Sequence, residues 1–190
     1  SNRADAAGLA WAKVQGLATA AIDHTNFASR EAFDAAMMTQ IDDFDPALVV
    51  LAGFMRILTP GFVAHYERRL VNIHPSLLPR HRGLHTHRRA LEAGEREHGA
   101  SVHFVTRELD GGPVVLQARV PIRDGDDEAT LAARVLEVEH RIYPQAVGWF
   151  ATGRLRCLDG AARLDGERLD QPVQFVFGSV RFDVAFWDTD

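Results

Sequence analysis

The sequence predicts an α/β protein with an open, mostly parallel, twisted sheet flanked by helices. Short β-rich apolar runs alternate with helical patterns along most of the chain, which is typical of such a sheet. Ala47–Ala52 is continuously apolar, as expected of a central strand that helices cover on both faces. Leu70–Ile73 has the same character and ends at His74. In open α/β sheets, ligands bind beyond the carboxyl ends of the strands, so we expect a site where these two runs end.

The first half of the chain alternates helices and strands whose ends carry suitable capping residues. Gly16 can take the left-handed conformation that closes a helix. Ser29 can accept a hydrogen bond from the first turn of the next helix, and Pro60 suits the first position of a third. In chain order we expect a helix over Ala4–Gln15, a strand over Leu17–Ile22, a helix over Arg30–Asp43, a strand over Ala47–Ala52, and a short helix capped by Thr59.

In the second half, a turn signal and a long apolar periodicity define the elements. Asp110–Pro113 joins two β-rich runs through two glycines, which favours an antiparallel hairpin. Pro144 is expected to kink the long helix that follows. In chain order we expect a strand over Leu70–Ile73, a helix capped by Thr86 that runs to Ala93, strands over Ser101–Thr106 and Val114–Ile122, and a helix over Asp127–Phe150. After Gly153 the pattern weakens.

Composition limits the class of protein. With 190 residues, 46% hydrophobic and 25% charged, the chain fits one soluble domain better than two. The net charge of -5 argues against nucleic acid as a partner. Cys157 is the only cysteine, which favours a reducing compartment, and no apolar run is long enough to span a membrane. We therefore expect a cytoplasmic protein. Its expected partners are small molecules, and its expected assembly is a monomer or a homodimer.

Asn72 and His74 are the candidate catalytic residues at the end of the second apolar strand. Side chains at positions i and i+2 of a strand leave by the same face, so both can reach one bound atom. Pro75 holds the backbone before it extended. Asp110, in the glycine-rich turn after the next long strand, can reach back to the imidazole and orient it. The three residues form a credible group for acid-base chemistry and oxyanion stabilisation.

Three other features of this region have competing interpretations. His85 and His87, with His81 nearby, could suggest a metal, but no metal-ligand spacing supports one, and we expect none. Ser76 lacks the flanking glycines of a nucleophile elbow. A local basic patch could hold an anionic ligand; it consists of Arg80, Arg82, Arg88 and Arg89.

Several long motifs of this sequence resemble the phosphoribosylglycinamide formyltransferases, folate-dependent enzymes of purine biosynthesis. The core Asn72–Pro79 is shared across folate formyltransferases and hydrolases, whereas its continuation Gly83–His87 looks like the purine enzyme in particular. The resemblance runs from Ser1 to about Gly166 and rests on Leu51–Leu58, Asn72–Pro79, Gly83–His87, His98–Val105 without Ala100, and Leu109–Pro113.

The resemblance implies a Rossmann-like formyltransferase fold and transfer of the formyl group of 10-formyltetrahydrofolate to glycinamide ribonucleotide, without a metal. By that resemblance, His74 is the catalytic acid, Asp110 raises its basicity, and Asn72 helps to hold the formyl oxygen. The implied folate-binding residues are Arg30, Met55, Arg56, Ile57, Leu58, Asn72, Thr106, Arg107, Glu108, Leu109 and Asp110. The implied ribonucleotide-binding residues are Leu136, Glu137, Val138 and Glu139, with Glu139 expected to contact ribose hydroxyls.

The two ends of the chain depart from the family pattern. The family opens with a strand, a phosphate-binding glycine-rich loop, a helix and a second strand, and this sequence starts at the end of that unit; we expect residues upstream of Ser1 to supply it. Residues 1–166 are predicted to form the formyltransferase domain and residues 167–190 an extension. Its apolar residues could form an added strand, a subunit contact or a disordered tail; they are Phe175, Val176, Phe177, Val180, Phe182, Phe186 and Trp187.

Two other function classes stay open on sequence grounds. One is a relative that hydrolyses formyl-folate or uses another acceptor, which we expect to differ in the Gly83–His87 segment. The other is a non-catalytic folate-binding protein left by loss of the phosphate loop. An assay of formyl transfer separates the three.

Overall fold

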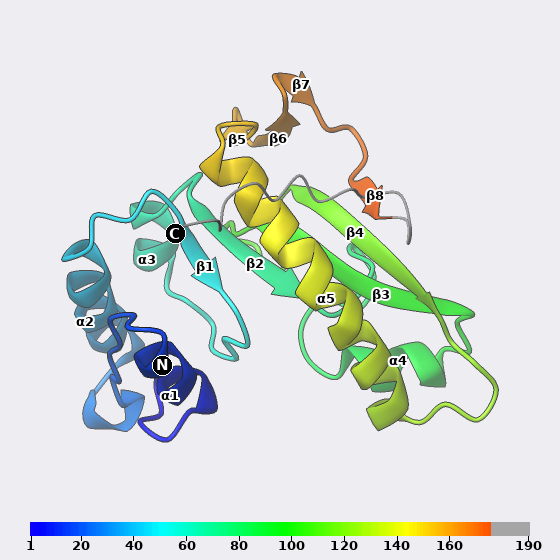
Figure 1. Ribbon diagram of the computed structural model, residues 1–190, viewed down its shortest axis with the longest axis horizontal. Coiled ribbons are helices and arrows are strands. Elements are labelled where there is room, and N and C mark those ends of the chain that lie inside the picture. Colours follow the sequence, from blue (N-terminus) through cyan, green and yellow to red (C-terminus); the bar gives the residue numbers. More distant parts are fainter. Residues whose placement is uncertain (176–190) are drawn as a thin grey trace, which may run out of the picture. The chain divides into compact units, whose positions relative to one another are not determined.

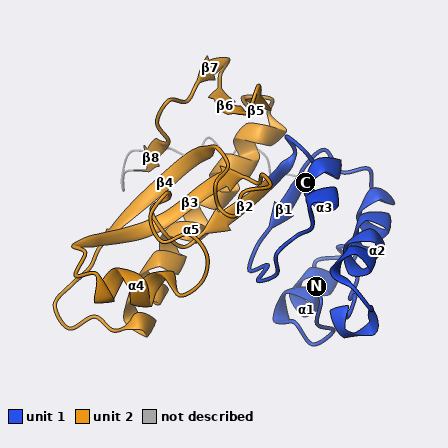
Figure 2. Cartoon of the chain, turned by 180° about the vertical axis from the view of Figure 1, so that it is seen from behind, with its two compact units in different colours: residues 1–70 blue, residues 71–190 orange. Residues whose placement is uncertain are grey.

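The computed structural model describes residues 1–175. The chain divides after Leu70 into two compact units, which are described separately (Figure 2). Helices and strands alternate as the sequence predicts (Figure 1). The α/β class is therefore confirmed.

Unit 1, residues 1–70, contains three α-helices, a short 3-10 helix and a strand. The caps form as predicted: the Ser29 hydroxyl accepts the Ala32 N–H at 3.1 Å, and the Thr59 hydroxyl accepts the Phe62 N–H at 3.3 Å. Gly16 has the left-handed φ of 72°. The elements are α1 (Ala7–Val14), η1 (His24–Asn26), α2 (Arg30–Asp42), β1 (Val49–Leu51) and α3 (Pro60–His65).

The predicted strand over Leu17–Ile22 is wrong. A strand needs a neighbour that pairs with its backbone groups residue after residue. Here the Leu17 N–H closes the preceding helix on the Ala12 carbonyl at 2.9 Å. The Ile22 N–H donates to the Ser1 carbonyl at 2.9 Å, and the Ser1 amino group donates to the Ala20 carbonyl at 3.0 Å. These isolated bonds make no ladder.

Unit 2 carries a sheet in which β2 (Leu70–His74), β3 (Glu97–Phe104), β4 (Val114–Pro121) and β8 (Val173–Phe175) lie in that order. The pairs β2/β3 and β3/β4 are antiparallel, so the predicted hairpin is confirmed, and β8 pairs with β4 in parallel. In this register, residues of β2 and residues of β4 each lie directly opposite residues of β3. This pairing brings together the side chains of the site described below.

The helix α5 (Glu128–Ala151) packs against β3 and β4. Its predicted apolar positions are buried, because their spacing places them on one face of the helix; Leu131, Val135, Val138 and Ile142 are each at most 1% exposed. Asp127 and Thr130 form a capping box at its start. Figure 1 shows α5 as the long yellow helix crossing the sheet.

The shorter helix α4 (Thr86–Glu92) has a different cap from the predicted one. Its N-cap is His85, in a left-handed conformation with φ 59°, and no side chain caps the first turn. Thr86 is instead 3% exposed as the first helical residue. The prediction failed because burial of the threonine, rather than capping, decides its position.

A second, smaller sheet was not predicted. It consists of β5 (Leu155–Leu158), β6 (Ala161–Leu164) and β7 (Glu167–Arg168), joined as antiparallel neighbours. Of the apolar C-terminal tail, Phe175 lies in β8, and its remaining residues fall outside the part of the chain described. The predicted boundary at residue 166 stays a prediction.

Residues 1–175 contain neither a membrane-spanning helix nor a cluster of metal ligands. None of the helices in this part of the chain has both the length and the apolar character needed to cross a membrane. Among the same residues, no cluster of three or more histidine, cysteine, aspartate or glutamate side chains could hold a metal ion.

Candidate active site

The carboxyl end of β2 presents the two predicted residues. Asn72 and His74 are two positions apart and leave the strand by the same face. On the neighbouring strand, His103 lies opposite Asn72 and Ser101 lies opposite His74. The imidazole of His74 is only 6% exposed, so its polar neighbours determine its chemistry.

Both nitrogens of His74 face oxygen atoms. Nε2 lies 3.0 Å from the backbone carbonyl of His81, and Nδ1 lies 3.5 Å from the Asp110 carboxylate. A carbonyl only accepts hydrogen bonds, so Nε2 carries a proton and donates it. A carboxylate at the other nitrogen favours a second N–H there. The doubly protonated ring is therefore the form that matches both neighbours, and this form is an acid.

The turn after β3 brings Asp110 to the histidine. Asp110 has a left-handed backbone with φ 48°, which aspartate tolerates better than most residues. Its carboxylate accepts the Gly83 N–H at 2.8 Å. Gly112 lets the turn approach the strand, because a Cβ there would lie 1.9 Å from the Phe104 carbonyl. The left-handed backbone, the Gly83 N–H and the close approach at Gly112 together fix one carboxylate.

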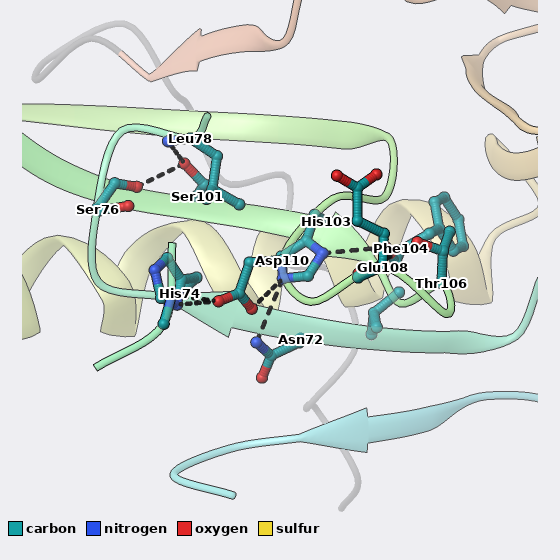
Figure 3. Close-up of polar contacts among 12 residues, drawn as sticks. Asn72, His74, Ser76, Leu78, Ser101, His103, Phe104, Thr106, Glu108 and Asp110 are labelled. Atoms are coloured by element: carbon teal, nitrogen blue, oxygen red, sulfur yellow. Dashed lines mark hydrogen bonds and ion pairs between the residues drawn. The ribbon is translucent and has the colours of Figure 1, made fainter. Parts of the chain in front are cut away.

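His103 also belongs to the site, although sequence reasoning gave it no role. Its Nδ1 donates to the Phe104 carbonyl at 3.0 Å, and burial lowers the pKa of this histidine. The neutral ring therefore leaves Nε2 free to accept, and the Asn72 amide donates to it at 3.3 Å. Nε2 also lies 3.7 Å from Asp110 (Figure 3). The contact orients the Asn72 amide and leaves its second N–H and its oxygen for a ligand.

The signal that could have found His103 is its place in the hairpin. It lies in a β-rich run whose strand pairs antiparallel with the strand of Asn72. Only the register was missing, and the sequence does not specify which residue stands opposite Asn72.

The predicted folate residues of unit 2 lie on the turn beside Asp110. The Thr106 hydroxyl donates to the Glu108 carbonyl at 3.4 Å, and Arg82 forms an ion pair with the Glu108 side chain. Arg107 is exposed, and Leu109 is 53% exposed. An apolar side chain this exposed beside buried acid-base groups is available to a ligand.

The predicted folate residues of unit 1 also gather locally. The Arg56 guanidinium lies over the ring of Phe33, 5.4 Å from its centroid, one turn along α2 from Arg30. Met55 is 73% exposed and Ile57 61% exposed. Both are therefore surface residues of unit 1 rather than core residues. Leu58 is half-buried.

The predicted ribonucleotide segment on α5 divides between core and surface. Val138 is 1% exposed and belongs to the core, whereas Leu136 and Glu137 are exposed. Burial raises the pKa of Glu139 to about 7. One turn later, the Tyr143 hydroxyl donates to the Val71 carbonyl at 3.1 Å, next to Asn72. Glu139 is thus on the helix face that leads to the site.

The other sequence features of this region have structural partners. Ser76 is fully buried, and its hydroxyl donates to the Arg80 carbonyl at 2.7 Å, so it braces the loop. In the basic patch, Arg80 pairs with Glu95 at 3.6 Å and Arg82 pairs with Glu108. Much of the positive charge expected there is therefore balanced by carboxylates.

Comparison with known proteins assigns the family. Residues 1–147 match the family described as formyl transferase. The chain belongs to the formyl transferase family. The formyl transferase match includes β2, Asp110 and most of α5, so the family and the geometry concern the same part of the chain.

Individual formyl transferases are similar over most of their length. The chain is 59% identical over 169 residues to the phosphoribosylglycinamide formyltransferase of Escherichia coli, covering 89% of this chain and 80% of that protein. Against the enzyme of Haemophilus influenzae, identity is 47% with the same coverage. A solved phosphoribosylglycinamide formyltransferase from Coxiella burnetii, in complex with CHES, matches with a TM-score of 0.87 and 50% identity, covering 93% of this chain and 83% of that one. The predicted fold and family are confirmed.

Proposed function

We propose that this chain transfers the formyl group of 10-formyltetrahydrofolate to the amine of phosphoribosylglycinamide, a step of purine biosynthesis. The relatives with the highest identities given above are phosphoribosylglycinamide formyltransferases. The observation that carries the proposal is the group at the end of β2: a histidine between two acceptors, with an amide beside it. The folate serves as cosubstrate.

Asn72 is proposed to stabilise the negative charge of the reaction. When the amine attacks the formyl carbon, the carbonyl oxygen becomes an oxyanion. The amide N–H of Asn72 that does not bond to His103 can donate to this oxygen, and the imidazolium of His74 adds positive charge nearby. Interactions that strengthen only as the charge develops lower the barrier.

His74 is proposed to supply the proton for the leaving folate nitrogen. The Nε2–H of His74 lies 3.0 Å from the His81 carbonyl, whereas Nδ1 lies 3.5 Å from Asp110, so Nδ1 holds its proton less tightly and is the nitrogen proposed to give it. The new bond joins the amine nitrogen to the formyl carbon, and the broken bond joins that carbon to the folate nitrogen. The attacking amine loses one proton and the folate nitrogen gains one, so the imidazolium is restored at the end. Asp110 keeps the ring oriented and offsets its charge.

Substrate binding is proposed to follow the division of residues described above. Within unit 2, Thr106–Asp110 and Asn72 are the proposed folate-binding residues. Within unit 1, Arg30 and Met55–Leu58 are proposed for the same ligand. Their exposed apolar side chains suit a flat ring system, and Arg30 suits a carboxylate. Leu136–Glu139 would meet the ribonucleotide, where Glu139 can accept from ribose hydroxyls.

The test is a product assay on the full-length protein with 10-formyltetrahydrofolate and phosphoribosylglycinamide. We expect formylated ribonucleotide and deformylated folate in equal amounts, with turnover that depends on both substrates. Folate release without formylated product would support the hydrolase alternative. Folate binding without either product would support the non-catalytic alternative.

Location and assembly are also part of the proposal. We propose a cytoplasmic enzyme, where its substrates would be made, and a monomer or a homodimer. Light scattering across a range of protein concentrations distinguishes the two assemblies.

A further inference from the structure

The loop between β2 and α4 determines how His74 is held. Residue 81 of this loop provides the carbonyl that accepts the Nε2–H of His74 at 3.0 Å. Whatever fixes that loop therefore fixes the orientation of the imidazole and decides which nitrogen faces Asp110. The question is which side chains do so.

Two buried side chains of the hairpin bind the loop. The Ser101 hydroxyl donates to the Ser76 carbonyl at 2.6 Å and accepts the Leu78 N–H at 3.0 Å (Figure 3). The Gln117 amide donates to the Leu78 carbonyl and to the Ser101 hydroxyl, both at 2.9 Å. Ser101 is 0% exposed and Gln117 is 3% exposed.

The donors of this pair are all used, either between the two side chains or toward the loop. A hydroxyl has one hydrogen and two lone pairs, and Ser101 uses all three. Both hydrogens of the Gln117 amide are used as well. A saturated buried network has one low-energy arrangement, since each lost bond would leave a buried polar group unpaired.

The sheet register aligns this network with the catalytic histidine. Ser101 is opposite His74 on β2 and opposite Gln117 on β4. Residues directly opposite one another lie on the same face of a sheet. The three side chains therefore form one row across three strands, and the loop folds back over that row.

We infer that Gln117 is a positioning residue for the formyl transfer proposed above. Through Ser101 and the backbone of Leu78 it holds the loop so that the His81 carbonyl keeps the Nε2–H of His74, and Nδ1 stays directed at Asp110. Gln117 does not touch the reacting atoms. The inference rests on the proposed function only for its kinetic readout.

The choice of substitution follows from the surroundings of Gln117. The residue lines a cavity of about 610 Å³ in unit 2, together with Leu77, Leu78 and Gln174. A small replacement would let water enter from this cavity and take over the lost hydrogen bonds. Gln117→Leu removes both donors while keeping most of the volume, so it is the sharper variant.

The experiment compares Gln117→Leu with wild type by steady-state kinetics and by NMR of the His74 ring. We expect kcat to fall by about tenfold, the size typical of lost supporting contacts around an active site. Both KM values should change less than about twofold, because no substrate contact is removed. The Nε2–H of His74 should exchange with water faster than in wild type.

The matched control is Gln174→Leu. Gln174 donates to the Gln117 oxygen at 3.4 Å from the same cavity, and its other side-chain hydrogen bonds within residues 1–175 join it to Pro172 and Arg119 rather than to the loop. Its kcat should stay within about twofold of wild type. An equal loss in this control, an unchanged kcat in Gln117→Leu, or a lost kcat with an unaltered His74 Nε2–H would each overturn the inference.

A second variant keeps the test decisive if Gln117→Leu fails to fold. Ser101→Ala removes the hydroxyl that accepts from Gln117 and that binds both Ser76 and Leu78 of the loop. It should also speed exchange of the His74 Nε2–H and lower kcat by about threefold, and an unchanged exchange rate would overturn the inference. Failure of the proposed function gives a different result: wild type makes no formylated ribonucleotide, while the NMR comparison still reads the position of His74.

Discussion

At the scale of single residues, Asp110 shows how a few contacts determine a chemical role. Its carboxylate faces His74 at 3.5 Å and His103 at 3.7 Å, and the Gly83 N–H binds it at 2.8 Å. A negative charge at this point favours a positively charged ring at His74, whereas burial keeps His103 neutral. Two histidines beside one carboxylate thus serve different purposes.

Asp110→Asn should remove most of the activity while changing the stability of the fold little. The amide keeps the shape and an oxygen for the Gly83 N–H, but it has no charge to favour the imidazolium of His74. We expect kcat to fall by about 10²- to 10⁴-fold, the range for acid-base catalysis. Measurement of kcat beside thermal unfolding checks this. A fall in kcat that merely follows a fall in Tm would contradict the assigned role.

Glu139→Gln should separate binding from stability. The pKa of Glu139 is raised to about 7 by burial, so folding opposes its ionisation. The unfolded glutamate ionises near pH 4.5, hence stability falls as pH rises from there to about 7. Removing the charge should stabilise the protein at pH 8 by about 1–2 kcal/mol, after allowance for partial exposure. Urea unfolding at pH 5 and 8 measures the difference.

The same variant should bind the ribonucleotide more weakly, because a neutral amide is a poorer acceptor for ribose hydroxyls than a carboxylate. Its KM for phosphoribosylglycinamide should rise while its KM for the folate stays unchanged. Stabilisation without any change in ribonucleotide KM would leave Glu139 as a buried helix residue with no ligand.

At the scale of elements, the structure explains how unit 1 holds the segment predicted to bind folate. Asp34 of α2 is 3% exposed, and its carboxylate accepts the Thr59 N–H at 2.7 Å, at the end of the segment that contains Met55–Leu58. Arg30 lies one turn earlier on the same helix. One buried bond therefore fixes the segment against the helix that carries the predicted folate arginine.

Asp34→Ala should destabilise the protein by about 1–3 kcal/mol, because it leaves a buried N–H without an acceptor. Asp34→Asn keeps an oxygen in place and should lose much less. Urea unfolding of both variants tests the claim, and equal losses would show that the bond to Thr59 is not the cause.

The sequence predicted the helices well where capping residues mark their ends. Ser29, Thr59 and Gly16 have the backbone and side-chain roles that their residue types favour. The predictions failed where contacts with residues distant in the sequence determine the local structure. The segment Leu17–Ile22 finds no ladder, and Thr86 is buried rather than capping.

The part of the site that depends on spacing within one strand was predictable from the sequence. The part that depends on pairing between strands was not. The spacing of Asn72 and His74 in one strand specifies that they share a face. The roles of His103 and Gln117 depend on the register of three strands, which a sequence pattern does not specify. The small sheet from Leu155 to Arg168 was missed because its strands are short and their apolar alternation is weak.

At the scale of the whole molecule, buried histidines couple stability to pH. Burial lowers the pKa of His98 to about 4, and its ring meets His87 at 3.2 Å. The unfolded histidine takes up a proton below about pH 6.5 while the folded one stays neutral. Stability should therefore be full above pH 6.5 and decrease toward pH 4, by up to about 3 kcal/mol from this residue.

Urea unfolding between pH 4 and 7 measures this dependence. His98→Leu should flatten the curve, whereas His140→Gln, a substitution of an exposed histidine on α5, should leave it unchanged. The same slope in all three proteins would mean that His98 is not a source of the acid sensitivity.

The account depends above all on His74 as the acid of a formyl transfer. The most direct measurement is the single-turnover rate of formyl transfer from 10-formyltetrahydrofolate to phosphoribosylglycinamide by His74→Ala, with folate binding measured alongside. We predict a rate lower by at least about 10²-fold, since acid-base catalysis by one side chain contributes that much or more, and folate binding within about threefold of wild type. A rate equal to that of wild type would contradict the account.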